Sequence, residues 1–207
     1  MKAESIRRLS LLEKPDVTKY LGEKAPEGIQ AWGNVEFLHN RKIAFFCSQR
    51  CPGSVLAKMY DLAQILSQRP VTLLGGFQSP VEQEFLNRLL RSAMSAIVCP
   101  ARALTGVRLK AEWREPMVQG RLLLLSPFDD GIRRTSRTLA LQRNRFVAAM
   151  ADEILLAFAS PGGANIKLFS EMRDWKKKIY TLNDPANQPL IAKGARPLLP
   201  QEVFNRF

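Results

Sequence analysis

Short apolar runs alternate with amphipathic segments along most of this chain. The apolar runs have the length of buried strands and cover residues 43–48, 71–74, 96–98, 122–125, 154–158 and 179–182. The segments between them carry apolar residues at helical spacing and cover residues 54–67, 80–91, part of the 110s, 136–150 and 164–176. This alternation predicts an α/β fold: a Rossmann-like, three-layer arrangement with a mainly parallel sheet.

The two ends of the chain are less regular. We expect an N-terminal extension over residues 1–40, a Rossmann-like core over 41–185 and a C-terminal tail over 186–207 that packs on the core. The extension reads as a short amphipathic helix and a stretch punctuated by Gly and Pro, and the tail contains three prolines. A length of 207 residues fits one domain with such extensions.

Three predicted loops follow strands at what would be one edge of the sheet. They are Ser48–Arg50, Gly75–Ser79 and Ser160–Asn165. Glycine lets backbone amides approach an anion, and a helix amino terminus adds a favourable dipole. The predicted phosphate or nucleotide site comprises Gln49, Arg50, Gly75, Gly76, Ser79, Gly162 and Gly163. Tight turns without a ligand are the alternative reading of each glycine pair.

The charge balance favours a polyanionic partner. The chain has 31 Lys and Arg against 19 Asp and Glu, a formal net charge of +12 and a pI near 10.1. Five arginines gather just before and within the helix predicted over 136–150: Arg133, Arg134, Arg137, Arg143 and Arg145. They read either as a phosphate track or as a solvated helix face.

No catalytic constellation or cofactor motif stands out. GxGxxG does not follow the first strand and GxxxxGK[ST] is absent, which disfavours a dinucleotide-binding dehydrogenase and a P-loop NTPase. The single histidine, His39, precedes the first strand, so we expect neither a His-based triad nor a His-based metal site. Cys47 and Cys51 form a C-x3-C pair, for which packing is favoured over metal or redox chemistry. We expect no cofactor.

Localisation follows from what the sequence lacks. The amino terminus has no apolar core of signal-peptide length, and no run approaches the roughly 20 apolar residues of a membrane-spanning helix. We therefore expect a cytoplasmic protein with reduced thiols and no membrane partner.

Five segments of the chain carry a family resemblance. They read IAFFCSQR, VTLLGGFQSPVEQEFLNRLL, LLLLSPF, QRNRFVAAMADEILLAFAS and KKKIYTLNDPANQPLIAKGA. In this order they are similar to the Rossmann-like core of the DNA-processing protein A family, also called DprA or Smf, within the SLOG superfamily. The resemblance spans about residues 25–197, and its most specific piece is Arg143-Asn144-Arg145 before an apolar helix.

This resemblance implies a protein that binds single-stranded DNA in DNA processing, recombination or uptake. It also implies a RecA-type recombinase as partner and favours a non-enzymatic role. On this basis we expect Arg50, Arg143, Arg145 and Lys167 to contact DNA. The formation of a homodimer is left open.

The chain departs from the family pattern in its three loops. Cys47 stands where the family has glycine, the second loop lacks the family's acidic residue and histidine, and Gly162–Lys167 replaces a Ser-Gly-x-x-x-Thr segment. A SLOG-type nucleotide-binding protein is therefore the alternative, either a ligand sensor or a hydrolase similar to the LOG phosphoribohydrolases. In the hydrolase, Glu82 or Glu171 would serve as the acid/base group.

Overall fold

The computed structural model describes residues 6–10, 15–92, 94–199 and 202. The strands of this part are β1 (Arg7–Ser10), β2 (Gly28–Gly33), β3 (Lys42–Cys47), β4 (Thr72–Gly75), β5 (Ser95–Val98), β6 (Leu122–Ser126), β7 (Glu153–Phe158), β8 (Lys178–Leu182) and β9 (Arg196–Leu198). The α-helices are α1 (Pro15–Leu21), α2 (Gly53–Leu66), α3 (Pro80–Arg91), α4 (Ala111–Val118), α5 (Arg137–Met150), α6 (Ala164–Asp174) and α7 (Gln188–Ile191). Short 3-10 helices are η1 (Gly22–Lys24), η2 (Val35–Leu38) and η3 (Pro185–Asn187). None of the described helices is long and apolar enough to cross a membrane.

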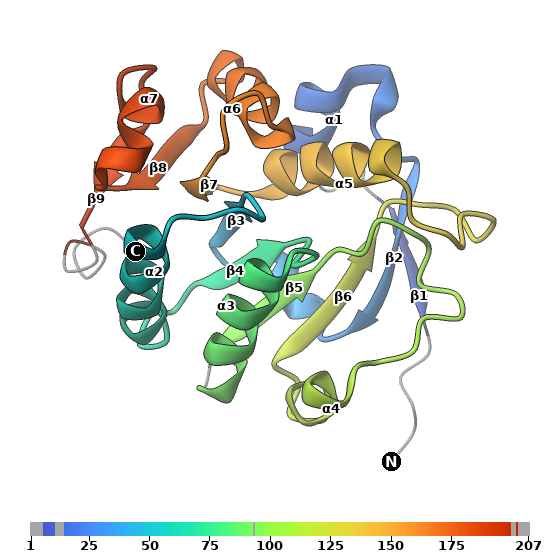
Figure 1. Ribbon diagram of the computed structural model, residues 1–207. Helices are drawn as coiled ribbons and strands as arrows, with labels where there is room; N and C mark the ends of the chain where they lie inside the picture. Colours follow the sequence, from blue (N-terminus) through green and yellow to red (C-terminus); the bar gives the residue numbers. More distant parts are fainter. Residues whose placement is uncertain (1–5, 11–14, 93, 200–201, 203–207) are drawn as a thin grey trace.

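The described strands form one sheet in the order β1-β2-β6-β5-β4-β3-β7-β8-β9 (Figure 1). The strands that run from β6 to β9 in this order pair in parallel, whereas β2 runs antiparallel to both β6 and β1. The six apolar runs correspond to β3 through β8, so the predicted α/β fold with a mainly parallel sheet is confirmed.

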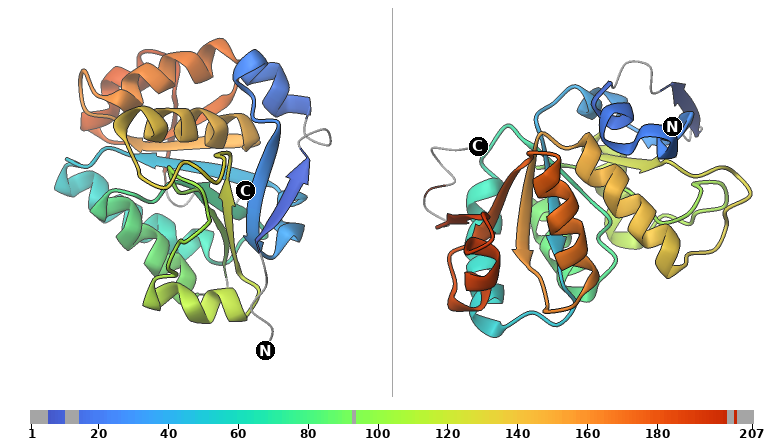
Figure 2. Two further views of the ribbon diagram at one scale, coloured as in Figure 1. Left: turned by 90° about the vertical axis from the view of Figure 1, so that its right-hand side faces the viewer. Right: turned by 90° about the horizontal axis from the view of Figure 1, so that it is seen from above.

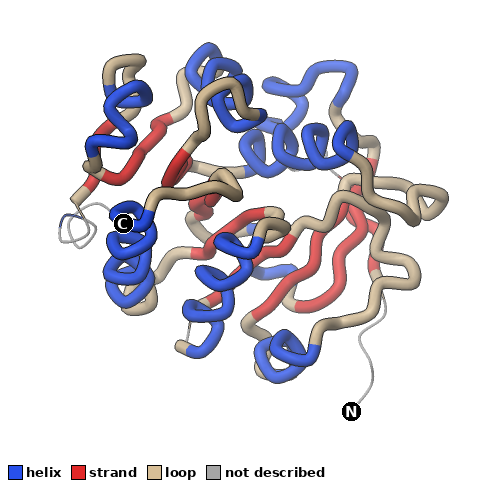
Figure 3. The backbone as a smooth tube through the Cα atoms, viewed as in Figure 1, coloured by secondary structure: helices blue, strands red, loops and turns tan. Residues whose placement is uncertain are grey.

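Helices cover both faces of the sheet and enclose two cores (Figures 2 and 3). Along β3, Ile43 and Phe45 enter the core beneath α2, α3 and α4, while Ala44 and Phe46 enter the core beneath α1, α5 and α6. Side chains on a strand alternate between its faces, so a strand covered on both sides must be apolar throughout. This requirement explains the uninterrupted apolar runs.

The sequence analysis missed the strands at both edges of the sheet. It placed no strand within residues 1–40. In the structure β2 pairs with β6, and its Ile29 and Ala31 are buried in the core beneath α1, α5 and α6. β2 was missed because glycines stand at both of its ends, where they are typical of turns rather than of strands. At the other edge, β9 pairs with β8 and tolerates Pro197, because an edge strand can leave one side of its backbone unpaired. The division of the chain at residues 40 and 185 stays a prediction.

Strand order reverses between β3 and β7. From β3 the chain crosses through α2 to β4 on one side, whereas β7 lies on the other side and is entered from α5. The loops after β3 and β7 therefore diverge toward opposite faces of the sheet. Open α/β sheets bind ligands in the crevice that such a reversal leaves at the carboxyl ends of the strands.

Candidate phosphate-binding cleft

A cleft of about 590 Å³ lies at this switch point. Its walls come from the loop after β3, the loop between β4 and α3, the loop between β7 and α6, and one face of α5. The lining residues are Cys47, Ser48, Gln49, Arg50, Gln78, Ser79, Pro80, Glu82, Ala140, Arg143, Asn144, Ser160, Gly163, Ala164 and Asn165. The structure thus brings Gln49, Arg50, Ser79, Arg143 and Gly163 of the predicted site residues together.

The loops after β3 and β7 are joined by hydrogen bonds. The Ser48 hydroxyl accepts from the Ser160 amide at 3.0 Å and from the Asn165 side chain at 3.4 Å. The Ser48 amide donates to the Phe158 carbonyl at 2.9 Å, and the Ser160 hydroxyl reaches the Arg50 carbonyl at 3.4 Å. These bonds hold the backbone that carries Gln49 and Arg50 against the start of α6.

The Glu82 carboxylate closes the amino end of α3. It accepts from the amides of Cys47 at 3.1 Å, Gln78 at 3.1 Å and Ser79 at 3.3 Å, while its own amide donates to the Ser79 hydroxyl. Its side chain is buried beneath the cleft. The anionic position at this helix terminus is therefore filled from within the chain, and Glu82 serves as a capping group rather than as a free acid or base.

Arg143 forms the floor of the cleft as a buried brace. Only 3% of the residue is exposed, and its guanidinium donates to the Cys99 carbonyl at 2.5 Å and to the side chains of Asn144 at 2.7 Å and Gln78 at 3.1 Å. Burial lowers the pKa of Arg143. These contacts join α5 to the ends of β4 and β5. The predicted contact of Arg143 with DNA stays a prediction, and the burial of the side chain does not favour it.

The glycine pair after β4 makes room for neighbouring side chains. A Cβ on Gly76 would lie 2.0 Å from the Arg143 guanidinium carbon, and a Cβ on Gly75 would lie 2.8 Å from the ring of Phe77. Neither glycine is among the residues that line the cleft. Their predicted contact with phosphate therefore remains untested, and the geometry assigns them a packing role.

The amino end of α6 is open to the cleft. Gly163 is the N-cap residue, no side chain caps the helix, and Gly163, Ala164 and Asn165 all line the cleft. Gly162 lies just outside it in the turn, where its φ of 68° suits glycine. Uncapped amides in the first turn of a helix are donors that an anion can accept.

Three exposed cations lie on the elements that form the cleft, and of these three Arg50 lines it. Arg50 extends from the loop after β3, Lys167 lies one turn into α6, and Arg137 begins α5. Arg137 shares a helix face with Ala140 and Asn144, which line the cleft, because residues three or four apart on a helix are neighbours. Within the described residues none of the three has an ion-pair partner, and Arg133 and Arg134 add exposed charge to the preceding loop.

Arg145 points to the other side of α5. Its guanidinium forms a two-pronged ion pair with Glu171 of α6 at 2.6 and 2.7 Å, and this pair raises the pKa of Arg145. It also lines a separate, more apolar pocket beside Phe128 and Leu141. Arg143 and Arg145 are two residues apart and cannot share a helix face. Neither Arg145 nor Glu171 lines the cleft, so their predicted roles there stay predictions without geometric support.

Sequence reasoning predicted Arg143 of α5 at the site but missed two other residues of this helix. Ala140 and Asn144 were not predicted as site residues, although helical spacing from Arg137 would have placed all three on one face. The opposite orientations of Arg143 and Arg145 were missed because residues close together in the sequence were treated as one cluster.

Fold and cleft together define a doubly wound α/β protein with a cleft at its switch point. A family model confirms the resemblance: the one for DNA recombination-mediator protein A matches residues 13–203. The chain belongs to this family. A search of curated proteins gives no match.

Solved structures of the family share the fold. DNA processing protein A from Streptococcus pneumoniae superposes with a TM-score of 0.80 at 17% identity, covering 99% of this chain and 75% of that chain. The protein from Helicobacter pylori, whose single-stranded DNA binding mode has been described structurally, gives a TM-score of 0.74 at 18% identity. That match covers 87% of this chain and 86% of that chain.

Proposed function

We propose that this protein binds single-stranded DNA through the cleft, as a DNA-processing protein that acts in recombination or DNA uptake. The observation that carries the proposal is the amino end of α6, which no side chain caps, together with exposed Arg50 in the cleft and exposed Arg137 and Lys167 on the two helices that help to form it. A negatively charged, flexible backbone fits this arrangement because amides and long cationic side chains bind phosphate without reading sequence. Family membership and the Helicobacter pylori relative support the same ligand.

The nucleotide-hydrolase alternative receives less support. Glu82 is engaged as the cap of α3, and Glu171 is paired with Arg145 outside the cleft. Acid/base catalysis requires a carboxylate within reach of the reacting atoms. A binding function is therefore preferred over hydrolysis.

Salt dependence of oligonucleotide affinity tests the proposal. We compare the wild type with Arg50→Gln, Arg137→Gln and Lys167→Gln, using a labelled oligo-dT and fluorescence anisotropy over a range of salt concentrations. Each phosphate contact removed should reduce the slope of log affinity against log salt by about 0.7, the single-strand value per contact. All three variants should weaken binding.

Arg114→Gln is the matched control. Arg114 is also exposed, and its substitution removes the same charge, but it lies on α4, which covers the face of the sheet opposite to α5 and α6. Its slope should equal that of the wild type. Equal losses in Arg114→Gln and in the Arg50, Arg137 and Lys167 variants would show that only overall charge matters, and would refute a DNA site at the cleft.

The family resemblance extends the proposal to partners. We propose a RecA-type recombinase as the protein that receives the bound strand, and a homodimer as the binding unit. Co-sedimentation with a RecA-type protein on oligo-dT tests the first, and analytical ultracentrifugation tests the second. The free thiols of Cys47, Cys51 and Cys99 support placement in the cytoplasm, which keeps thiols reduced.

A further inference from the structure

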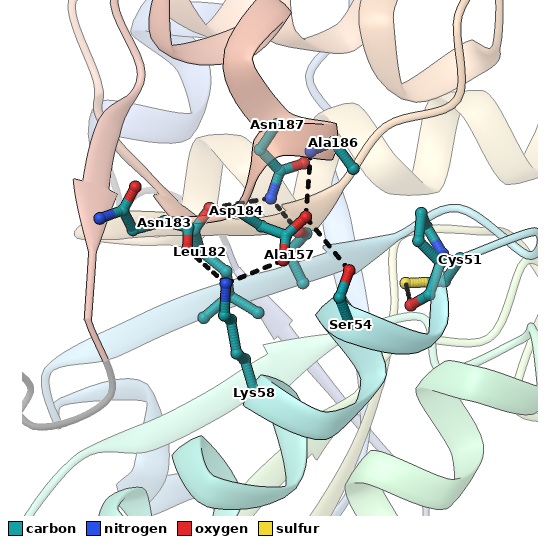
Figure 4. A network of polar contacts seen from close by, with 10 residues as sticks. Cys51, Ser54, Lys58, Ala157, Leu182, Asn183, Asp184, Ala186 and Asn187 are labelled. Carbon is teal, nitrogen blue, oxygen red and sulfur yellow. Dashed lines mark hydrogen bonds and ion pairs between the residues drawn. The ribbon is translucent and has the colours of Figure 1, made fainter.

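Arg143 is a buried cation without a counter-charge in direct contact. Asp184, a buried carboxylate, is by contrast paired with Lys58 at 2.8 Å (Figure 4). The hydrogen bonds of Arg143 go to one backbone carbonyl and two neutral side chains, and no ion pair joins it to a carboxylate of the described residues. An unpaired charge is costly to bury. Accordingly, burial lowers the pKa of Arg143, and the opposing effects of Cys99 and Glu82 are smaller.

Arg143 determines which way two side-chain amides face. A guanidinium only donates hydrogen bonds, so each amide must turn its oxygen toward it. Nε of Arg143 donates to Oδ1 of Asn144 at 2.7 Å, and Nη2 donates to Oε1 of Gln78 at 3.1 Å. In Arg145 the same two nitrogens bind both carboxylate oxygens of Glu171. In Arg143 this fork instead takes one oxygen from each of two amides, which therefore lie side by side.

The amide nitrogens of Gln78 and Asn144 remain as donors. Neither nitrogen has a hydrogen-bond partner among the described residues, and both residues line the cleft. Gln78 is exposed and belongs to the loop after β4, whereas Asn144 is partly exposed and belongs to α5. Hydrogen bonds in series polarise one another, so an amide whose oxygen is bound to a cation becomes a stronger donor. Two such donors stand next to each other at the cleft.

We propose that the side-chain nitrogens of Gln78 and Asn144 bind a phosphate group of the DNA strand, and that Arg143 is the positioning residue that orients both amides. This inference rests on the proposed function, because it places the strand in the cleft. Phosphate oxygens only accept hydrogen bonds and carry negative charge, so they match two donors that are backed by a buried cation. Arg143 acts on the strand through the two amides and does not itself touch it.

The side-chain NH2 signals of Gln78 and Asn144 in proton–nitrogen NMR spectra report on these donors directly. Each pair of signals is assigned by its loss in Gln78→Glu or Asn144→Asp. Both pairs should move when oligo-dT is added, whereas the pair of Gln142, which lies on α5 outside the cleft, should not. An abasic oligomer of the same length, which keeps the phosphates, should move the same signals. Shifts that require the bases would assign the amides to a base oxygen and overturn the proposal.

Oligo-dT affinity measures the contribution of the two amides. Gln78→Glu and Asn144→Asp keep an oxygen for Arg143, so the fold should be retained, but they lose the amide nitrogen. Each should weaken binding about tenfold or more. Gln142→Glu adds the same charge to the exposed part of α5 outside the cleft and should change affinity less than about twofold. Equal losses in all three variants would show that added charge alone weakens binding, and would overturn the role of the amides.

Arg143→Lys tests the positioning role. Lysine keeps the charge but cannot hold two oxygens in parallel. Affinity should fall while the salt slope keeps its wild-type value, and the NH2 signals of Gln78 and Asn144 should no longer move with oligo-dT. Wild-type movement of both pairs of signals in folded Arg143→Lys would overturn the positioning role.

Failure of this inference can be told from failure of the proposed function. If oligo-dT moves the backbone amides of Ala164 and Asn165 but neither pair of NH2 signals, the cleft binds DNA without Gln78 and Asn144, and only this inference is refuted. If oligo-dT moves no signal of the residues that line the cleft, the proposed function is refuted, and this inference with it.

Discussion

Replacement of Gly76 by alanine should destabilise the protein through a specific partner, Arg143. The added Cβ would lie 2.0 Å from the guanidinium carbon and 2.0 Å from one of its terminal nitrogens. Real Cβ atoms do not make such contacts, so the guanidinium must move. It would then loosen its hydrogen bonds to Cys99, Gln78 and Asn144.

The size of the effect follows from these contacts. Overpacking in a filled region costs about 1–3 kcal/mol, and a hydrogen bond made by a charged group contributes about 1.5–3 kcal/mol. We expect Gly76→Ala to lower the free energy of unfolding by about 3 kcal/mol. Arg143→Ala should also lower the free energy of unfolding by about 3 kcal/mol, because it leaves the buried Cys99 carbonyl without this donor. In the Arg143→Ala background the three closest contacts of the alanine at 76 are removed, so this substitution should cost less than about 1 kcal/mol.

Urea unfolding of the four proteins of this double-mutant cycle measures the coupling. A cost of about 3 kcal/mol should lower the melting temperature of a chain of this size by about 6–12 °C. Gly131→Ala is the control, since no atom lies within 4 Å of a Cβ there. Additive effects of Gly76→Ala and Arg143→Ala would show that Gly76 does not serve to make room for the Arg143 guanidinium. The predicted contact of Gly76 with phosphate would then have to be considered again.

The remaining predictions concern three carboxylates and one arginine. Glu82→Gln should lower the free energy of unfolding in urea by about 2 kcal/mol, because an amide cannot accept from three backbone donors as a carboxylate does. Glu84 is half-exposed, so the control Glu84→Gln should cost at most about 0.5 kcal/mol. Equal costs would contradict the capping role of Glu82. Arg145→Met should leave oligo-dT affinity unchanged and cost about 0.5 kcal/mol, since its ion pair is partly exposed and outside the cleft; a loss of affinity like that of Arg50→Gln would refute this placement. Burial alone would raise the pKa of Asp184, but its hydrogen bonds, led by Lys58, lower it below 3.8. The stability that Asp184 adds should therefore be full above about pH 4 and fall as pH drops further, so unfolding curves of wild type and Asp184→Asn should converge in acid; a constant difference would disprove the shift.

The central part of the fold could be read from the chain because its signal is local. Strands such as β7 are apolar on both faces, and a helix such as α3 begins at a Ser-Pro capping sequence that fixes its start. Strand β2, which lies between β1 and β6, could not be read in this way. It owes its place to pairing with β6, and its terminal glycines do not indicate that partner.

The candidate site was predictable as an edge but not as a set of contacts. Loop positions such as Arg50 and Gly163 follow from strand ends alone. Whether Arg143 binds a ligand or braces the fold depends on which acceptors surround it, and those come from three separate elements. Likewise, the capping of α3 by Glu82 and the open end of α6 are distinguished only when the side chains are in place.

The most direct test of a phosphate site at the amino end of α6 is an NMR titration of the backbone amides with a short oligo-dT. The Ala164 and Asn165 amides, which open into the cleft, should show the largest shifts, together with Arg50. The Gln78 and Ser79 amides, already bound to Glu82, should change little. Large shifts at Gln78 and Ser79 with none at Ala164 and Asn165, or shifts confined to α4, would contradict the account.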